Sequence, residues 1–480
     1  MKVKSSFIYP ALAAVFIIAF IIIYLLATQQ ALAVSAWWLT TGMLLPAMLA
    51  SLLIRSVVLR FFIAITFFTQ FLGVPWFILK MDEYTYSGWS AVKDFNFTIS
   101  EFFYVYLSIS IFLLLIICFF ATISIILPLP SLNTTITSYP KKQKVANANS
   151  KFYSFVIAIF IIILTPLNLW MFDIGISLVG IQPPSLPFKL SGGLHYFTKY
   201  FVPFLIFYLY NKTSRKFLPA SLVMAYALIL GTSQISRSAT VFILMPVIFF
   251  AIMDNRRILL VITSLWGLFC VQVAGLMRNV VYVSQGAGVR VTADTAGIVE
   301  KVHSLVTTQF EHIDLLTMAF GIIGRIESPQ GLVLGHQFSP EAIGGVSVII
   351  KRFFYQGWVV IDHDAYHLEW IATTLPQGFV SGGGFFGDIL PILNSGIPYF
   401  VLFALITAIY FYGGEWLVRR IGNRFNSLNL YYALAMVFSV LFFTNCGTII
   451  WWGFVFFLVF LLVTPKIRFA LIFNLKTQRV

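Results

Sequence analysis

Long apolar runs separated by short polar connections recur along the whole chain. A run of about 20 apolar residues is what an α-helix needs to cross the hydrocarbon core of a bilayer. Twelve runs are predicted to span a membrane: residues 7–27, 37–54, 61–79, 102–127, 152–170, 196–210, 217–233, 239–253, 258–276, 397–412, 428–446 and 449–463. The pattern therefore predicts an all-α polytopic membrane protein of about 12 transmembrane helices.

The composition agrees with this pattern. Hydrophobic residues make up 60% of the chain and charged residues only 10%, whereas a soluble domain carries about a quarter charged residues. The first apolar run follows Lys2 and Lys4, as in a signal peptide, but it is longer than the apolar core of one. We therefore expect this run to be a retained first helix.

Charge is distributed unevenly over the predicted connections. If the N-terminus is inside, the inner connections hold 20 of the 31 basic residues, and of the 17 acidic residues they hold only Asp254 and Glu415. This is the bias that the positive-inside rule describes. The net charge of +14 is therefore a signal of topology, and no nucleic-acid partner is expected.

One outer connection is far longer than the others. The predicted organisation is residues 1–277 with helices 1–9, residues 278–395 as a large extracytoplasmic loop, and residues 396–480 with helices 10–12 and a cytoplasmic tail. The segment after residue 276 holds five of the six histidines and ten of the 17 acids. Loops of this length are usually functional or disordered, and a cap without a catalytic role is the alternative.

The densest acid–base cluster of the loop covers residues 362–369. On a helix, His363 and His367 would share a face at i,i+4 spacing. The pattern is similar to a two-histidine metal motif, but it has Asp364 where a metalloprotease has Glu, and no third ligand is evident. A carboxylate–imidazole pair that removes a proton from a sugar hydroxyl fits better, with solvated surface polarity as the alternative.

Arginines form a second group of candidates. Arg237 lies in a Ser-Gln-Ile-Ser-Arg-Ser turn between two apolar runs, Arg278 ends the ninth run, and Arg352 follows an apolar stretch of the loop. An arginine at the membrane is costly unless it is paired, and a phosphate group is its natural bidentate ligand. The alternative for Arg237 is that its side chain snorkels to the interface.

These features together resemble the O-antigen polymerase family, the Wzy-type polymerases of oligosaccharide repeat units, which is related to the O-antigen ligases. The resemblance rests on the Ser-Arg-Ser turn, the large loop after it, and a Thr-Thr…Gly…Gly-Phe-Phe-Gly-Asp stretch at residues 373–388 that leads into the tenth run. It covers roughly residues 231–413 and the overall topology.

The resemblance implies a GT-C-like fold and an inverting glycosyltransferase in the bacterial inner membrane, with both termini cytoplasmic and the large loop periplasmic. Its substrate would be an undecaprenyl-pyrophosphate-linked oligosaccharide, with no cofactor and no metal. Membrane lipid and a chain-length regulator protein are the other expected partners. A ligase that transfers glycan to lipid A core, and a flippase or exporter of lipid-linked oligosaccharide, are the alternatives.

Three sets of site residues follow from this reading. Transfer needs a base for the acceptor hydroxyl, cations for the departing pyrophosphate, and aromatic rings that stack on sugars. The expected base is among His367, Asp364, His363, Asp362 and Glu369, with the first two preferred. The expected pyrophosphate ligands are Arg237, Arg278, Arg352 and Arg325, and the expected sugar-stacking residues are Trp358, Tyr366 and Trp370.

Overall fold

The computed structural model of the chain describes residues 31–79, 99–132, 146–174, 176, 186–187, 190–213, 217–234, 237–286, 389–425, 428–445, 455 and 458–459. These residues form helices almost throughout, and none of them belongs to a strand. The predicted spans 7–27 and most of 449–463 lie outside the described residues, as does the loop from residue 287 to residue 388.

The helices follow the order of the apolar runs. They are α2 (Ala31–Leu53), α3 (Val57–Leu79), α4 (Ile99–Ile126), α5 (Ala146–Asp173), α6 (Leu190–Tyr196), the π-helix η5 (Phe197–Phe201), α7 (Val202–Lys212), α8 (Phe217–Ser233), α9 (Arg237–Met253), α10 (Arg257–Gly286), α17 (Ile389–Asn394), α18 (Ile397–Arg424) and α19 (Leu428–Asn445).

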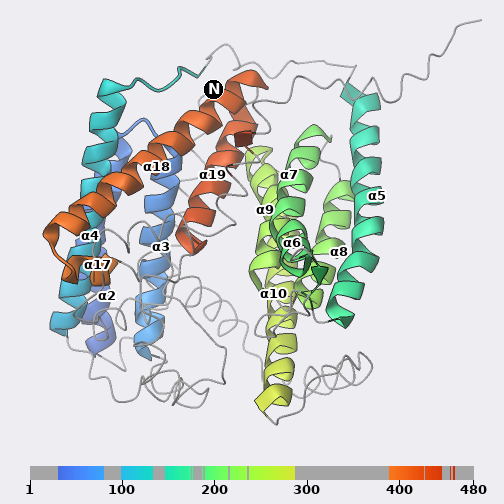
Figure 1. Cartoon of the computed structure of the whole chain (residues 1–480), viewed down its shortest axis with the longest axis horizontal. Coiled ribbons are helices and arrows are strands. Elements are labelled where there is room, and N and C mark those ends of the chain that lie inside the picture. Colours follow the sequence, from blue (N-terminus) through green and yellow to red (C-terminus); the bar gives the residue numbers. More distant parts are fainter. Residues whose placement is uncertain are drawn as a thin grey trace, which may run out of the picture.

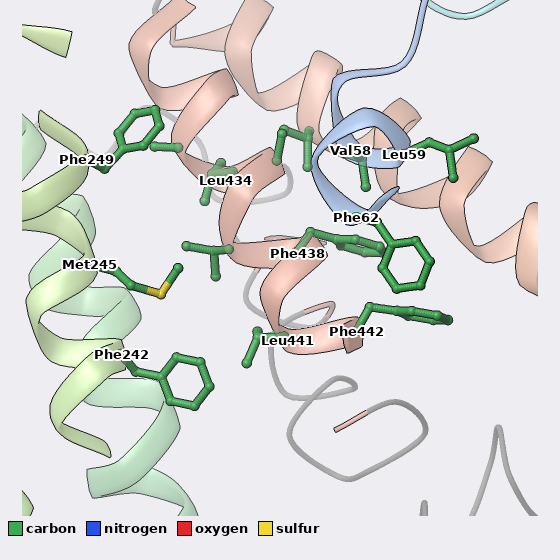
Figure 2. Close-up of a cluster of buried hydrophobic side chains, with 14 of the residues drawn as sticks. Val58, Leu59, Phe62, Phe242, Met245, Phe249, Leu434, Phe438, Leu441 and Phe442 are labelled. Carbon is green, nitrogen blue, oxygen red and sulfur yellow. The ribbon is translucent and has the colours of Figure 1, made fainter. Parts of the chain in front are cut away.

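The helices pack in two groups, which are seen side by side in Figure 1. One group contains α2, α3, α4, α17, α18 and α19, and α18 crosses the group obliquely. The other group contains α5 to α10. Helices α9 and α19 join the groups through apolar side chains, among them Phe242, Met245 and Phe249 of α9 and Leu434 and Phe438 of α19 (Figure 2).

The described helices have the length and composition of a membrane protein. Four of them are long and apolar enough to cross a bilayer: Phe103–Ile126, Lys151–Asp173, Arg257–Ala274 and Ile397–Arg424. Shorter apolar helices cover Trp37–Leu53, Val57–Phe71, Phe217–Ser233, Ala239–Ile252 and Leu430–Phe442. Large apolar side chains such as Leu53 and Ile125 are exposed on the helix surface, as lipid-facing residues are. The all-α membrane architecture is thus confirmed, while the count of 12 spans stays a prediction.

Two helices extend well beyond the predicted spans. Helix α10 continues from the predicted end at residue 276 to Gly286, and α18 continues from residue 412 to Arg424. The second of these predicted runs stops at residue 412, directly before Gly413 and Gly414, and glycine weakens a helix. In the structure a Cβ at Gly414 would overlap the ring of Phe438 in α19, so the glycine permits close packing of α18 on α19.

The predicted span 196–210 is a helix with an internal change of register. Helical structure runs from Leu190 to Lys212, but residues Phe197–Phe201 form the π-helix η5. Pro203 stands at the start of α7 and has no N–H to donate to the preceding turn. A π segment inside a helix often occurs at a functional site, and η5 contributes to the cluster described next.

Candidate functional site

Helices α8, α9 and α10 approach one another closely at Gly231. A Cβ at this position would overlap Thr240 Oγ1 of α9 and would lie 3.8 Å from the Cβ of Ala274 in α10. Thr240 is fully buried, and its hydroxyl donates to the carbonyl oxygen of Ala227 in α8 at 3.5 Å. Small residues let membrane helices approach closely. This contact therefore fixes the positions of α8, α9 and α10 relative to one another along the helix axes, which is their relative depth in the bundle.

Two of the arginine positions predicted from the sequence lie one helical turn beyond this contact. Arg237 is the first residue of α9 and precedes Thr240 by three positions, and Arg278 of α10 follows Ala274 by four. Residues three or four apart share a helix face, and one turn rises about 5.4 Å. The register thus brings positions 237 and 278 to one depth on two helices that pack together.

The other predicted site residues lie outside the described residues. These are the expected bases, the remaining arginines and the expected sugar-stacking residues: Asp362, His363, Asp364, His367, Glu369, Arg325, Arg352, Trp358, Tyr366 and Trp370. Their proposed roles therefore stay predictions. Within the described ranges, no group of three His, Cys, Asp or Glu side chains is arranged to hold a metal ion.

A buried polar network lies at the same end of α8 and α9. Gln234, which follows the end of α8, donates through Nε2 to Thr198 Oγ1 of η5 at 2.8 Å and approaches Asn168 Oδ1 of α5 at 3.5 Å. Asn168 in turn donates through Nδ2 to the Tyr226 hydroxyl of α8 at 2.9 Å. All four residues are at most 1% exposed, so three helices and the α8–α9 turn are joined by hydrogen bonds that water does not reach.

The donors and acceptors of this network fix the orientation of the Gln234 amide. The Thr198 hydroxyl donates to the Leu194 carbonyl oxygen at 2.9 Å, so its own oxygen must accept from the Gln234 amide nitrogen. Gln234 Oε1 is buried and has no hydrogen-bond donor among the described residues. The network therefore retains one acceptor that is not satisfied by the part of the chain that the structure describes.

A second buried polar network surrounds Glu415 of α18. One carboxylate oxygen accepts from the Ser56 hydroxyl and the Val58 N–H at the start of α3, both at 3.0 Å. The other accepts from Arg419 Nε at 2.6 Å and from the Tyr431 hydroxyl of α19 at 2.5 Å. The carboxylate is fully buried and both of its oxygens are satisfied. It joins α3, α18 and α19.

Arg419 extends this network to the connections between helices. Its guanidinium also donates to the carbonyl oxygen of Pro130, at 3.2 Å, and to that of Arg55. Farther along α18, Asn423 donates to the Ser131 carbonyl oxygen at 2.9 Å. The end of α18 is therefore tied to the α2–α3 turn and to the chain after α4, which points to a structural role.

The two networks lie at opposite ends of the bundle. Figure 2 shows Phe249 of α9 near the Leu434 end of α19, and Phe242 near the Leu441 end. Leu434 is one turn from Tyr431, which binds Glu415. The end of α9 that begins at Arg237 is thus the end far from Glu415.

Sequence reasoning gave no role to most of these polar residues. Asn168 lies within the predicted span 152–170, and a polar residue inside an apolar run is a signal of function or pairing. Thr198 and Tyr226 carry no such signal, because single Thr and Tyr residues are common in membrane helices. Glu415 was placed in a connection, and its burial follows from the extension of α18.

Comparison of the chain with protein-family models, with curated proteins and with solved structures found no match.

Proposed function

We propose that this protein polymerises undecaprenyl-pyrophosphate-linked oligosaccharide repeat units at the extracytoplasmic face of the bacterial inner membrane. The growing chain is the donor, and a sugar hydroxyl of a new repeat unit is the acceptor. The observation that carries the proposal is the register of α9 and α10, which brings Arg237 and Arg278 to one depth beside a buried polar network.

The charge distribution supports an extracytoplasmic position for this arginine pair. The end of the bundle that contains Glu415 also carries the basic residues Arg55 and Arg256 of the helix connections and Arg419 of α18. The positive-inside rule assigns such an end to the cytoplasm. The arginine pair would then lie on the opposite side, where lipid-linked repeat units are expected by analogy with the O-antigen polymerases.

The length of α10 relative to the bilayer supports the same extracytoplasmic position. Helix α10 has 30 residues, which corresponds to about 45 Å, whereas the hydrocarbon core is about 30 Å thick. If α10 enters the core at Arg257, about 20 residues cross it, and position 278 lies near the far interface. A pyrophosphate headgroup attached to a membrane-embedded isoprenoid lies at that same interface.

The reaction balances with these groups. The acceptor oxygen forms a bond to the anomeric carbon of the growing chain, and the bond from that carbon to the pyrophosphate oxygen breaks. The hydroxyl proton passes to a base, for which His367 and Asp364 are the preferred candidates, and undecaprenyl pyrophosphate leaves. Fixed guanidinium groups stabilise the negative charge that grows on the leaving group, and their bidentate geometry suits phosphate oxygens.

The test uses the full-length protein, purified and reconstituted with lipid-linked repeat units of a stated structure. We expect a ladder of products that differ by one repeat unit. Arg237→Ala and Arg278→Ala should abolish the ladder, whereas Arg257→Ala should retain it. Arg257 is a matched control because it lies on the same helix as Arg278, at the opposite end, and is exposed.

Other results would identify the alternatives. Transfer that occurs only when lipid A core is added would indicate a ligase, and movement of lipid-linked saccharide across the bilayer without a new glycosidic bond would indicate a flippase. Normal ladders from both arginine variants would refute the phosphate-binding role of the pair.

A further inference from the structure

Gln234, three positions before Arg237, is anchored from two directions. The backbone N–H of Gln234 donates to the Leu230 carbonyl oxygen at 3.1 Å, which continues the hydrogen bonding of α8. The side-chain amide of Gln234 donates to Thr198 Oγ1 in η5 at 2.8 Å. Only Ile235 and Ser236 separate Gln234 from the first residue of α9. The start of α9 is therefore closely linked to a hydrogen bond with a different helix.

We infer that Gln234 is a positioning residue for Arg237, and that the hydrogen bond from Gln234 to Thr198 holds the arginine in place for the departing pyrophosphate. This inference rests on the proposed function. It assigns no contact with substrate to Gln234, which acts through the turn that it holds.

Burial makes this hydrogen bond difficult to replace. Gln234 is 1% exposed and Thr198 is fully buried, so water cannot take the place of a missing partner. The residues on both sides of this bond make further hydrogen bonds. Thr198 is tied to the Leu194 carbonyl oxygen, and the Gln234 amide lies next to Asn168, which is bonded to Tyr226. A change in the Gln234 side chain would remove its bonds to Thr198 and Asn168, while Thr198 keeps its bond to Leu194 and Asn168 keeps its bond to Tyr226.

The chemistry of the leaving group explains why the orientation of Arg237 matters. A guanidinium binds a phosphate through two parallel hydrogen bonds, which require a defined orientation. A displacement of about 1 Å at a catalytic group can cost about 100-fold in rate. An ammonium group is a flexible point charge and has no such fixed geometry. The effect of losing Gln234 should therefore depend on whether residue 237 is arginine or lysine.

The test is a double-mutant cycle between Gln234→Met and Arg237→Lys in the full-length reconstituted protein. In the Arg237 background we expect Gln234→Met to lower kcat about 10-fold to 100-fold, with little change in KM for the lipid-linked repeat unit. In the Arg237→Lys background, kcat is already reduced, and Gln234→Met should lower it by less than about threefold. Thr198→Val removes the acceptor of the Gln234 amide, together with the local bond from Thr198 to the Leu194 carbonyl oxygen, and should reproduce this pattern, which covers the case in which Gln234→Met does not fold.

Gln70→Met is the matched control for loss of a buried glutamine. Gln70 of α3 is fully buried and accepts a hydrogen bond from the Tyr106 hydroxyl at 2.7 Å, in the other group of helices. Its effect on kcat should be the same in both backgrounds. If Gln234→Met and Thr198→Val also have equal effects in both backgrounds, Gln234 has only a structural role and the inference fails. If the unsubstituted protein forms no ladder, the proposed function itself fails, whereas a normal ladder from Arg237→Ala would refute only the phosphate-binding role of Arg237.

Discussion

The Glu415–Arg419 pair allows a quantitative prediction about the stability of the fold. Arg419→Met removes the cation that lies 2.6 Å from a fully buried carboxylate, and the Arg419 side chain is itself only 11% exposed. Glu415 would keep its three other donors, from Ser56, Val58 and Tyr431. None of these carries a formal charge, so the buried carboxylate would lack a counterion.

The expected cost is several kcal/mol. Removing one partner of a buried ion pair destabilises a protein by about 3–5 kcal/mol. The carbonyl oxygens of Pro130 and Arg55 would also lose a donor, but they lie at the edge of the network and can bind water. Glu415→Gln should cost less. Its oxygen can still accept from Val58, and Arg419 keeps its carbonyl acceptors and some access to solvent.

The double variant tests the physical reasoning. When both charges are absent, no uncompensated charge remains, so Glu415→Gln with Arg419→Met should be more stable than Arg419→Met alone. The assay is thermal unfolding of the detergent-purified protein, followed by the fraction that remains monodisperse. Arg420→Met is the control, because Arg420 is exposed and lies 5.0 Å over the Trp416 ring, without an ion pair among the described residues. Strictly additive effects, or equal effects of Arg419→Met and Arg420→Met, would refute the argument.

Three further predictions concern packing, topology and metal dependence. Gly231→Val should strongly reduce the yield of folded protein because its side chain would overlap Thr240, whereas Gly42→Ala has nothing within 4 Å of the new Cβ and should be tolerated, as purification yields of both variants would show. A single cysteine placed at position 363 should react with a membrane-impermeant thiol reagent in spheroplasts, and one at position 424 should not; the opposite pattern would exclude extracytoplasmic polymerisation. EDTA should leave polymerisation unchanged, and inhibition that added zinc reverses would support a metal site at His363 and His367.

Much of the helix layout could be predicted from the sequence because apolar runs and membrane helices have the same length scale. The bounds of α8 agree with the predicted run at both ends, and those of α19 differ by one residue. The largest differences occur where polar residues continue a helix. Glu415 and Arg419 end the apolar pattern, but they lie inside α18 because each finds partners in distant parts of the chain. Such long-range pairing leaves no local trace in a single sequence.

The candidate site was only partly predictable for the same reason. The cost of an arginine near the membrane identified Arg237 and Arg278 as candidates, and helix packing then brought their positions to one depth. The π-helix was not predictable in detail, because Pro203 indicates an interruption but not its form. The contact between Gln234 and Thr198 joins residues 36 positions apart, and hydropathy carries no information about such pairs.

The two buried networks differ in how completely their polar groups are paired. In the apolar interior an unsatisfied polar group is costly, so each buried group without a partner calls for an explanation. Around Glu415 both carboxylate oxygens accept hydrogen bonds and a cation is adjacent. Around Gln234 one buried acceptor has no donor among the described residues, and this network lies beside the arginine pair. Gln70 Nε2, in the other group of helices, is also buried without a partner among the described residues, so an unpaired group alone does not mark a functional end. The proposed function instead depends on positions 237 and 278, which lie at the Gln234 end of α9 and α10.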